Sequence, residues 1–213
     1  LNAPLAKHLD LPAEEQDRIG NGQGRPLYGA ELRVVDENGT VLPNDGETQG
    51  QLQIRGHWIV DRYFGQDRSA LTDDGWFDTG DIATLDENGY TIIRDRSKDI
   101  IKSGGEWIST VDLENIAVGH PKVANAAAIA ARHPKWDERP VICAIPRPGS
   151  DLTQDELLAF YDGKLPRWQM PDRVVFVESL PIGATGKVVK ATLREQYGDI
   201  LWNDALAEDG ASA

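Results

Sequence analysis

The sequence predicts a mixed α/β protein in which an antiparallel, β-rich first part is followed by a small two-layer domain of helices and strands. Two observations support this prediction. Between Pro26 and Arg96 the chain consists of short runs of alternating apolar and polar residues, separated by Gly, Asn, Asp or Pro, as is typical of strands and turns. After Gly105, apolar runs alternate with segments that carry helix-capping residues, which indicates helices packed on a sheet.

The first 24 residues join an acidic stretch, PAEEQD, to GNGQG, and this composition predicts an irregular segment. Strands are then predicted over residues 30–36, 40–43, 50–56, 81–86 and 90–96. The tetrapeptide DENG lies between strands twice, at 36–39 and 86–89. Each copy predicts a hairpin whose turn is closed by a Gly with positive φ.

In the second part, Ser109 or Thr110 can cap a helix over residues 111–119, and Gly119 ends it. The sequence TQDE at 153–156 is a capping box that opens a further helix. The remaining predicted elements are strands over 123–132, 141–147 and 173–179, and helices over 156–165 and 189–198. We expect the boundary between the two parts at residues 95–98.

Composition excludes several classes of function. The 213 residues carry a net charge of −13, with most of the excess acid before Arg94, which argues against a nucleic-acid partner or an anionic-membrane anchor. No apolar run approaches the roughly 20 residues that a membrane span needs. A cytoplasmic protein is expected.

The only cysteine, Cys143, lies in the apolar run VICAI, so that core packing is more plausible than reactivity. The four histidines lack metal-ligand spacing with it. Neither an internal disulfide nor a metal site is predicted.

Three stretches could carry chemistry. In GWFDTGDIA, residues 75–83, Asp81 follows a Gly at the start of a strand, where a carboxylate can accept hydrogen bonds from two vicinal ribose hydroxyls. The alternative is a loop with an Asx turn.

The second stretch is RDRSKDIIKSGGEWIS, residues 94–109. Its cations suit phosphate, and Gly104-Gly105 would let a ligand approach the backbone. The alternative is a solvated basic turn. Trp107 serves either as core packing or as a platform beside a ligand.

The third stretch is PIGATGKVVK, residues 181–190. It is not a phosphate-binding P-loop, because Pro181 replaces the first Gly and Val188 replaces the Ser or Thr that would hold magnesium. What remains is a Gly-rich loop that presents Lys187, either as a mobile functional cation or as an ordinary surface lysine.

Together and in this order, the three stretches resemble the C-terminal portion of the adenylate-forming superfamily, which comprises acyl-CoA synthetases, peptide-synthetase adenylation domains and luciferases. The resemblance runs from about Gly24 to about Tyr197. It is closest to medium- and long-chain fatty-acid-CoA ligases in the motifs WFDTGD, DRSKDIIKSGGEWIS, HPKWDERP, LPRWQMPD and ATGKVVKATLRE.

This resemblance implies a reaction in two steps: a carboxylic acid reacts with ATP to form an acyl-adenylate, and CoA then displaces AMP. It also implies an organisation. Residues 1–94 would be the β-barrel-like end of a large N-terminal domain, 95–98 a hinge with Lys98 as pivot, 99–198 a small mobile domain and 199–213 a tail.

The resemblance assigns roles to individual residues. Asp81 would bind the ribose, helped by Arg96, and Lys98, Lys102 and Trp107 would contact the nucleotide. Lys187 would bridge the acid and the α-phosphate in the first step. Ser103, Gly104 and Gly105 would line the CoA tunnel in the second step, and Asp95 with Lys98 would form the hinge. Asp95 stands where many members of the superfamily have Gly. The fatty-acyl branch tolerates Asp at this position.

The phosphate loop, the ligands of Mg²⁺ and the acyl pocket of such enzymes would lie upstream of Leu1, so we expect the chain to be the last part of a larger enzyme that is inactive alone. A fatty acid is the first expected substrate, and 3-methylmercaptopropionate is the alternative acid. A non-catalytic interaction module is the alternative function. A homodimer is left open.

Overall fold

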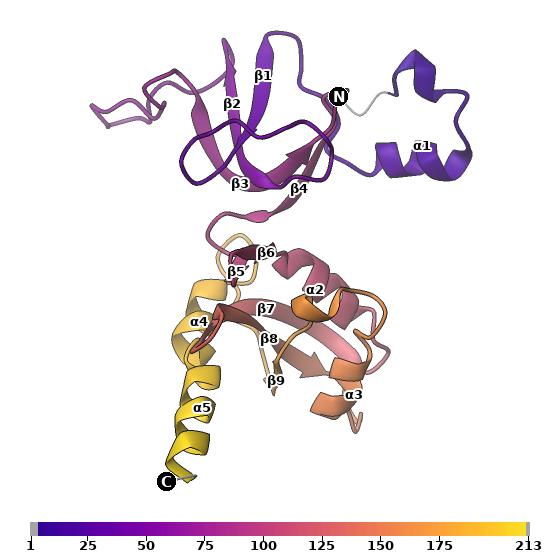
Figure 1. Cartoon of the computed structure of the whole chain (residues 1–213), viewed down its shortest axis with the longest axis vertical. Helices are drawn as coiled ribbons and strands as arrows, with labels where there is room; N and C mark the ends of the chain where they lie inside the picture. Colours follow the sequence, from indigo (N-terminus) through magenta and orange to yellow (C-terminus); the bar gives the residue numbers. More distant parts are fainter. Residues whose placement is uncertain (1–3, 212–213) are drawn as a thin grey trace. The chain divides into compact units, whose positions relative to one another are not determined.

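The computed structural model describes residues 4–211, with the side chains of all of these except Arg18 and residues 208–211. The chain divides into two compact units, Leu1–Lys98 (unit 1) and Asp99–Ala213 (unit 2) (Figure 1). The mixed α/β prediction with antiparallel sheets is confirmed.

Unit 1 is built on a four-stranded antiparallel sheet in the order β1-β2-β3-β4. The strands are β1 (Ala30–Val35), β2 (Gly50–Gly56), β3 (Phe77–Leu85) and β4 (Thr91–Arg96). Within the described residues β1 and β4 do not pair, so this sheet is open; the β-barrel-like part that the resemblance implied for the larger domain stays a prediction. A small core of Val34, Leu52, Ala83 and Leu85 lies on one of its faces.

Both DENG turns form as predicted. The Asp36 carboxylate accepts the N–H groups of Asn38 and Thr40 at 2.9 and 2.8 Å, and Asp86 repeats the pattern in the turn between β3 and β4. The strand predicted over residues 40–43 is wrong, however, because only an isolated bridge between Val35 and Val41 forms there. Pro43 has no N–H with which to extend a ladder.

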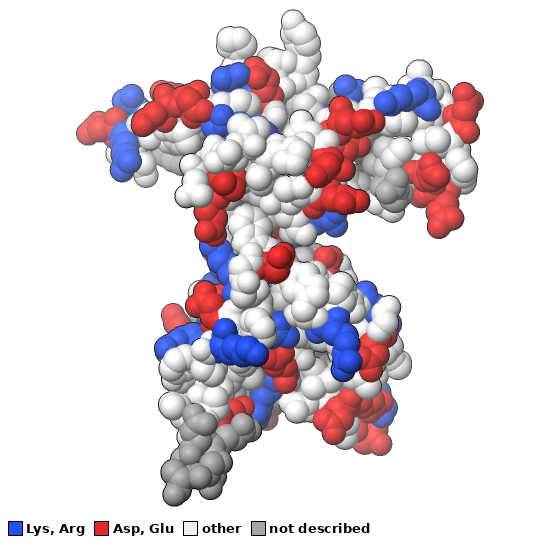
Figure 2. All heavy atoms as spheres, in the orientation of Figure 1, with Lys and Arg blue, Asp and Glu red and all other residues white. Residues whose placement is uncertain are grey.

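The prediction of an irregular segment over residues 1–24 is also wrong. A 3₁₀ turn, η1 (Ala6–His8), and a helix, α1 (Ala13–Gly20), form there. Glu14 and Glu15 lie in the first turn of α1, where acidic side chains stabilise the helix dipole, and they stay exposed to solvent on a strongly acidic surface (Figure 2). The acidic stretch was therefore a helix-start signal.

The described part of unit 2 contains five strands: β5 (Ile101–Ser103), β6 (Glu106–Ile108), β7 (Val123–His133), β8 (Asp137–Pro146) and β9 (Arg173–Phe176). The long antiparallel β7–β8 hairpin forms its centre. Because β7 pairs along the whole of β8, both β5 and β9 lie on the other edge of β8, β5 at its start and β9 farther along.

Helices cover both faces of this sheet. On one face pack α2 (Thr110–Val118) and α3 (Gln154–Ala159), and on the other α4 (Lys190–Tyr197) and α5 (Ile200–Ala211) (Figure 1). The second helical layer is an addition to the predicted two layers. Alanines dominate β7, and four of them, Ala126, Ala127, Ala128 and Ala131, are buried; their small side chains let helices approach closely from either side.

Both predicted helix caps form. Ser109 accepts the N–H of Asp112, and Thr153 accepts that of Glu156, each at 3.2 Å. Two helix predictions need correction. The helix expected over 156–165 ends at Ala159, since tighter turns follow it and bring the buried Tyr161 to the carbonyl of Leu113. Residues 199–213, expected to be a tail, contain α5.

No helix among the residues described is long and apolar enough to cross a membrane.

Candidate functional site

In unit 1, Asp81 and Arg96 face each other across the β3–β4 ladder. Arg96 Nε lies 3.1 Å from Asp81 Oδ1, and the two side chains are 56% and 18% exposed. The sequence placed both residues in one nucleotide site, and the structure brings them together. A carboxylate held at the surface beside a guanidinium can accept hydrogen bonds from a polyhydroxylated ligand.

The backbone around Asp81 is held on both sides. The Thr79 hydroxyl accepts the N–H of Asp81 at 3.1 Å and donates to the carbonyl of Leu52 at 2.9 Å. Gly80 has φ +72°, and its carbonyl accepts the N–H of Ser97 at 3.0 Å. The Asp81 carboxylate is therefore presented by a fixed turn.

The expected hinge, residues 95–98, is only partly irregular. Asp95 and Arg96 end β4, and Asp95 is buried with its carboxylate accepting the N–H of Arg96 at 2.7 Å. Ser97 is hydrogen-bonded to Gly80. Lys98 is exposed and is the last residue of unit 1.

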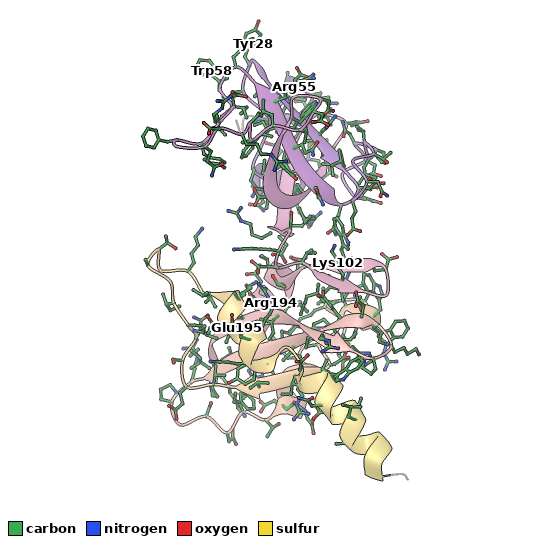
Figure 3. All side chains as sticks on the ribbon, turned by 90° about the vertical axis from the view of Figure 1, so that its left-hand side faces the viewer. Tyr28, Arg55, Trp58, Lys102, Arg194 and Glu195 are labelled. Carbon is green, nitrogen blue, oxygen red and sulfur yellow. The ribbon has the colours of Figure 1, made fainter. Side chains whose placement is uncertain are left out.

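In unit 2, the stretch interpreted as a soft loop is a hairpin. Strands β5 and β6 pair over three residues each, and Lys102 lies opposite Trp107. Gly104 and Gly105 form the turn with φ +59° and +92°; this two-residue turn needs positive φ at both positions, which explains the glycine pair locally. Lys102 is exposed (Figure 3), whereas Trp107 is half-buried.

Gly104 also touches the turn between β7 and β8. Its N–H donates to the Trp136 carbonyl at 2.9 Å, and a Cβ at position 104 would lie 3.0 Å from Trp136 Cε3. A Cβ at Gly105 would meet nothing within 4 Å. One glycine is thus packed against protein, and the other faces open space.

Sequence reasoning missed the residues that hold this hairpin. Arg139, buried at the start of β8, donates to the Ser103 hydroxyl at 3.2 Å and forms an ion pair with Asp172 at 2.6 Å. Both charged residues lie inside motifs that carry the resemblance. The available signal was an arginine next to an apolar, buried strand, because such a charge is almost always paired.

Lys187 lies on the Gly-rich turn that the sequence singled out. Ile182 and Val188 form an isolated bridge, the Gly183 N–H donates to the Lys187 carbonyl at 2.8 Å, and Gly186 has φ +77°. The backbone of Lys187 is therefore ordered. Its side chain is exposed, and it has no ion-pair partner in the described part of the chain.

Lys190 differs sharply from Lys187 although both belong to the same motif. Its ammonium lies 2.7 Å from Glu114 Oε1 and donates to the Thr110 hydroxyl at 2.5 Å, and the side chain is only 12% exposed. Lys190 therefore fastens α4 to α2. Of these two lysines, only Lys187 is available to a ligand.

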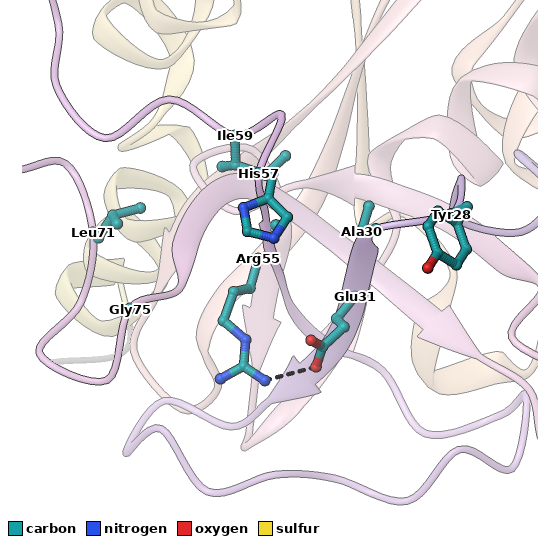
Figure 4. Close-up of a pocket in the computed structure, with 10 residues that line it drawn as sticks. Tyr28, Ala30, Glu31, Arg55, His57, Ile59, Leu71 and Gly75 are labelled. Carbon is teal, nitrogen blue, oxygen red and sulfur yellow. Dashed lines mark hydrogen bonds and ion pairs between the residues drawn. The ribbon is translucent and has the colours of Figure 1, made fainter.

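A concavity of about 650 Å³ lies in unit 1, and Asp81 is not among the residues that line it (Figure 4). Its lining includes Tyr28, Glu31, Arg55 and His57. Arg55 and Glu31 form an ion pair at 2.6 Å, and so they largely neutralise each other. None of the residues selected from the sequence lines this concavity.

No group of three or more His, Cys, Asp or Glu residues that could hold a metal ion occurs within the described residues. Cys143 is fully buried, and desolvation raises the pKa of its thiol to about 12. This agrees with a packing role for the thiol.

Comparison with known proteins decides the family. Residues 112–187 match the AMP-binding enzyme C-terminal domain. This part of the chain belongs to the family of AMP-binding enzyme C-terminal domains, and the chain is similar to acyl-CoA ligases of the adenylate-forming superfamily. It is 62% identical over 200 residues to 3-methylmercaptopropionyl-CoA ligase of Ruegeria pomeroyi and 54% identical over 200 residues to medium-chain-fatty-acid–CoA ligase of Ectopseudomonas oleovorans.

Each of these matches covers 94% of this chain and 37% of the relative. The crystal structure of ATP-bound MatB from Rhodopseudomonas palustris matches with 32% identity and a TM-score of 0.74, over 84% of this chain and 36% of that one. The chain thus spans about 37% of the length of curated acyl-CoA ligases. The resemblance derived from its motifs is confirmed.

Proposed function

We propose that this chain is the part of an AMP-forming acyl-CoA ligase that carries the lysine of the adenylation step and the glycine turn of the thioester step. The observation that carries the proposal is the contrast between Lys187, ordered in its backbone and exposed, and Lys190, buried in an ion pair. The turn that presents Lys187 depends on Gly186, whose φ of +77° glycine adopts without strain.

Unit 1 would hold the nucleotide. Asp81 has carboxylate oxygens suited to ribose hydroxyls, and its ion pair with Arg96 holds the carboxylate in place. ATP, once bound, would supply the phosphoanhydride whose α-phosphate the acid attacks. The exposed Lys98 and Lys102 would add positive charge near the phosphates, and Trp107 would offer an apolar surface.

The task of Lys187 would be electrostatic. Its ammonium would pair with the carboxylate of the acid and with the α-phosphate, and so offset the negative charge that gathers during the attack. Because the structure gives Lys187 no competing acidic partner among the described residues, that charge is available in full. Ser103, Gly104 and Gly105 would serve the second step, where the absence of side chains at the turn leaves room for the pantetheine arm.

A chimeric enzyme tests this proposal. The chain replaces the matching 37% of the Ruegeria pomeroyi ligase, and we expect the product to convert 3-methylmercaptopropionate, ATP and CoA to the thioester. In this chimera Lys187→Ala should lower acid-dependent ATP–pyrophosphate exchange by roughly 10²- to 10³-fold, while preformed acyl-adenylate still gives acyl-CoA.

The matched control is Lys164→Ala, which removes another exposed lysine of unit 2 and should leave both steps unchanged. If both steps survive Lys187→Ala, the role given to Lys187 is wrong. If the folded chimera performs neither step, the chain is not a working part of a ligase, and the alternative of a non-catalytic interaction module is favoured.

The order of identities, 62% to the 3-methylmercaptopropionyl-CoA ligase and 54% to the medium-chain enzyme, favours 3-methylmercaptopropionate over a fatty acid as the substrate. Mg²⁺ would be bound outside this chain. A cytoplasmic location and a homodimer stay predictions.

A further inference from the structure

The β5–β6 hairpin is too short to hold its own position. Each strand has three residues, and isolated two-stranded hairpins of this size are unstable in water. Its ties to the central hairpin include the pairing of Ser103 with Asp137 and the hydrogen bond from Gly104 to Trp136. Asp137 has φ +68°, so this contact is made through strained backbone.

Arg139, two residues farther along β8, is fully engaged. Its Nε donates to Asp172, at 3.0 Å to each carboxylate oxygen. One terminal nitrogen donates to Ser103 Oγ and the Trp168 carbonyl, and the other to the Met170 carbonyl and Asp172. All five N–H groups of the guanidinium therefore have acceptors.

These contacts join three segments: the hairpin through Ser103, the central sheet through Arg139 itself, and the 167–172 segment through its carbonyls and Asp172. The Arg139 side chain is 11% exposed. A guanidinium so enclosed has no donor left for a substrate, and its planar fork cannot be replaced by a lysine, whose charge sits on a single nitrogen.

We infer that Arg139, with Asp172 as its counter-ion, is a positioning residue that fixes the Gly104–Gly105 turn for the thioester step. This inference rests on the proposed function for its kinetic part only. Loss of Arg139 should loosen the turn, so that CoA meets it less often in the productive geometry, whereas Lys187, on a separate turn that ends in α4, keeps its place.

The first experiment is amide hydrogen exchange on the 213-residue chain. In Arg139→Met, the segment 101–109 should exchange at least tenfold faster, while 125–131 in the centre of β7 is unchanged. The double variant Arg139→Met/Asp172→Leu removes both charges and guards against misfolding caused by an unpaired carboxylate. Arg132→Met is the control, because Arg132 forms an exposed ion pair with Asp199.

The second experiment uses the chimera described above. Both Arg139 variants should raise the KM for CoA at least tenfold and should lower ATP–pyrophosphate exchange by a clearly smaller factor, because the same hairpin also carries Lys102 and Trp107. Equal losses in the two steps, or an unchanged exchange rate of segment 101–109 in a folded variant, would overturn the inference. If the unsubstituted chimera is inactive, the proposed function fails, and hydrogen exchange alone decides the role of Arg139.

Discussion

Arg194 of α4 forms an ion pair at 2.8 Å with Asp99, the first residue of unit 2. Asp99 is therefore tied to its own unit, with its side chain only 13% exposed. On the other side, Ser97 is tied to unit 1 through the Gly80 carbonyl. Lys98 is the one residue between these two attachments, and we therefore propose it as the pivot of the expected hinge.

Fixing the φ angle of Lys98 should affect the rates of the two half-reactions differently. Proline fixes φ near −65°, so Lys98→Pro in the chimera should permit one conformation and hinder the other. We expect one half-reaction to fall at least tenfold and the other to stay within about threefold. Lys98→Ala controls for the lost charge. If both half-reactions keep their rates in Lys98→Pro, Lys98 is not the pivot.

The two lysines of the Gly-rich motif should differ in their effect on stability. Lys187→Ala removes an exposed side chain and should change the free energy of unfolding of the chain by less than about 0.5 kcal/mol. Lys190→Ala leaves Glu114 without its cation in a nearly buried site and should cost about 2 to 3 kcal/mol. Urea titrations of both variants measure this contrast, and equal stabilities would contradict it.

The sequence predicted well those structural features that depend on residues close to one another along the chain. The turns at Asp36 and Asp86 and the caps at Ser109 and Thr153 each need residues no more than four positions apart, and all four form. The β5–β6 hairpin was missed because three-residue strands are too short to show alternation. Helix α1 was missed because its charged first turn was interpreted as loop composition.

The residues of the candidate site also differ in whether the sequence alone could reveal their roles. Asp81, Lys187 and the glycine pair could be selected from motifs. The ion pair of Arg139 with Asp172 joins residues 33 positions apart, and that of Lys190 with Glu114 joins two helices. Such pairings depend on the tertiary fold, so the sequence could not show which cations are exposed and which hold the structure together.

Substitutions at the glycine turn should differ by position. Gly104→Ala forces a Cβ into the left-handed region, at about 1 to 2 kcal/mol, and also against Trp136, whereas Gly105→Ala meets only the backbone cost. Gly104→Ala should therefore be the more destabilising in thermal unfolding. Asn tolerates positive φ, so Gly105→Asn is the matched control. If the two alanine variants lose the same stability, the Trp136 side chain moves to make room for the added Cβ.

In the chimera, the larger variant Gly104→Leu should impair thioester formation and spare adenylation, because its side chain would obstruct the proposed path of the pantetheine arm. The half-reaction assays used for Lys187 measure both steps. An equal loss of both would indicate misfolding or a different path.

The free energy of unfolding should fall at alkaline pH because the thiol of Cys143 is buried. Burial raises the pKa of this thiol to about 12, whereas an unfolded thiol loses its proton near pH 8.5. The unfolded state therefore binds fewer protons above that pH, and the free energy of unfolding should drop by about 2 kcal/mol by pH 10. Burial also raises the pKa of Tyr161, which extends the loss to higher pH.

Urea unfolding of unit 2 between pH 7 and 10 measures this effect, with Cys143→Ala as the control. That variant is less stable at every pH, but it should lack the slope contributed by the thiol. The same slope in Cys143→Ala would mean that other groups cause the alkaline loss.

Residues outside this chain should determine which carboxylic acid the enzyme prefers as substrate. The exposed Lys187 and the Gly104–Gly105 turn lie in unit 2, whereas three concavities found within the described residues are lined by residues of unit 1. We therefore expect two chimeras that share this chain, one completed by the Ruegeria pomeroyi ligase and one by the Ectopseudomonas oleovorans ligase, to differ in the acid that they use. Each should follow the enzyme that completes it, in kcat/KM for 3-methylmercaptopropionate against a medium-chain fatty acid. If both chimeras prefer the same acid, residues of this chain take part in acid selection, and unit 2 contributes more to specificity than its exposed Lys187 and its glycine turn indicate.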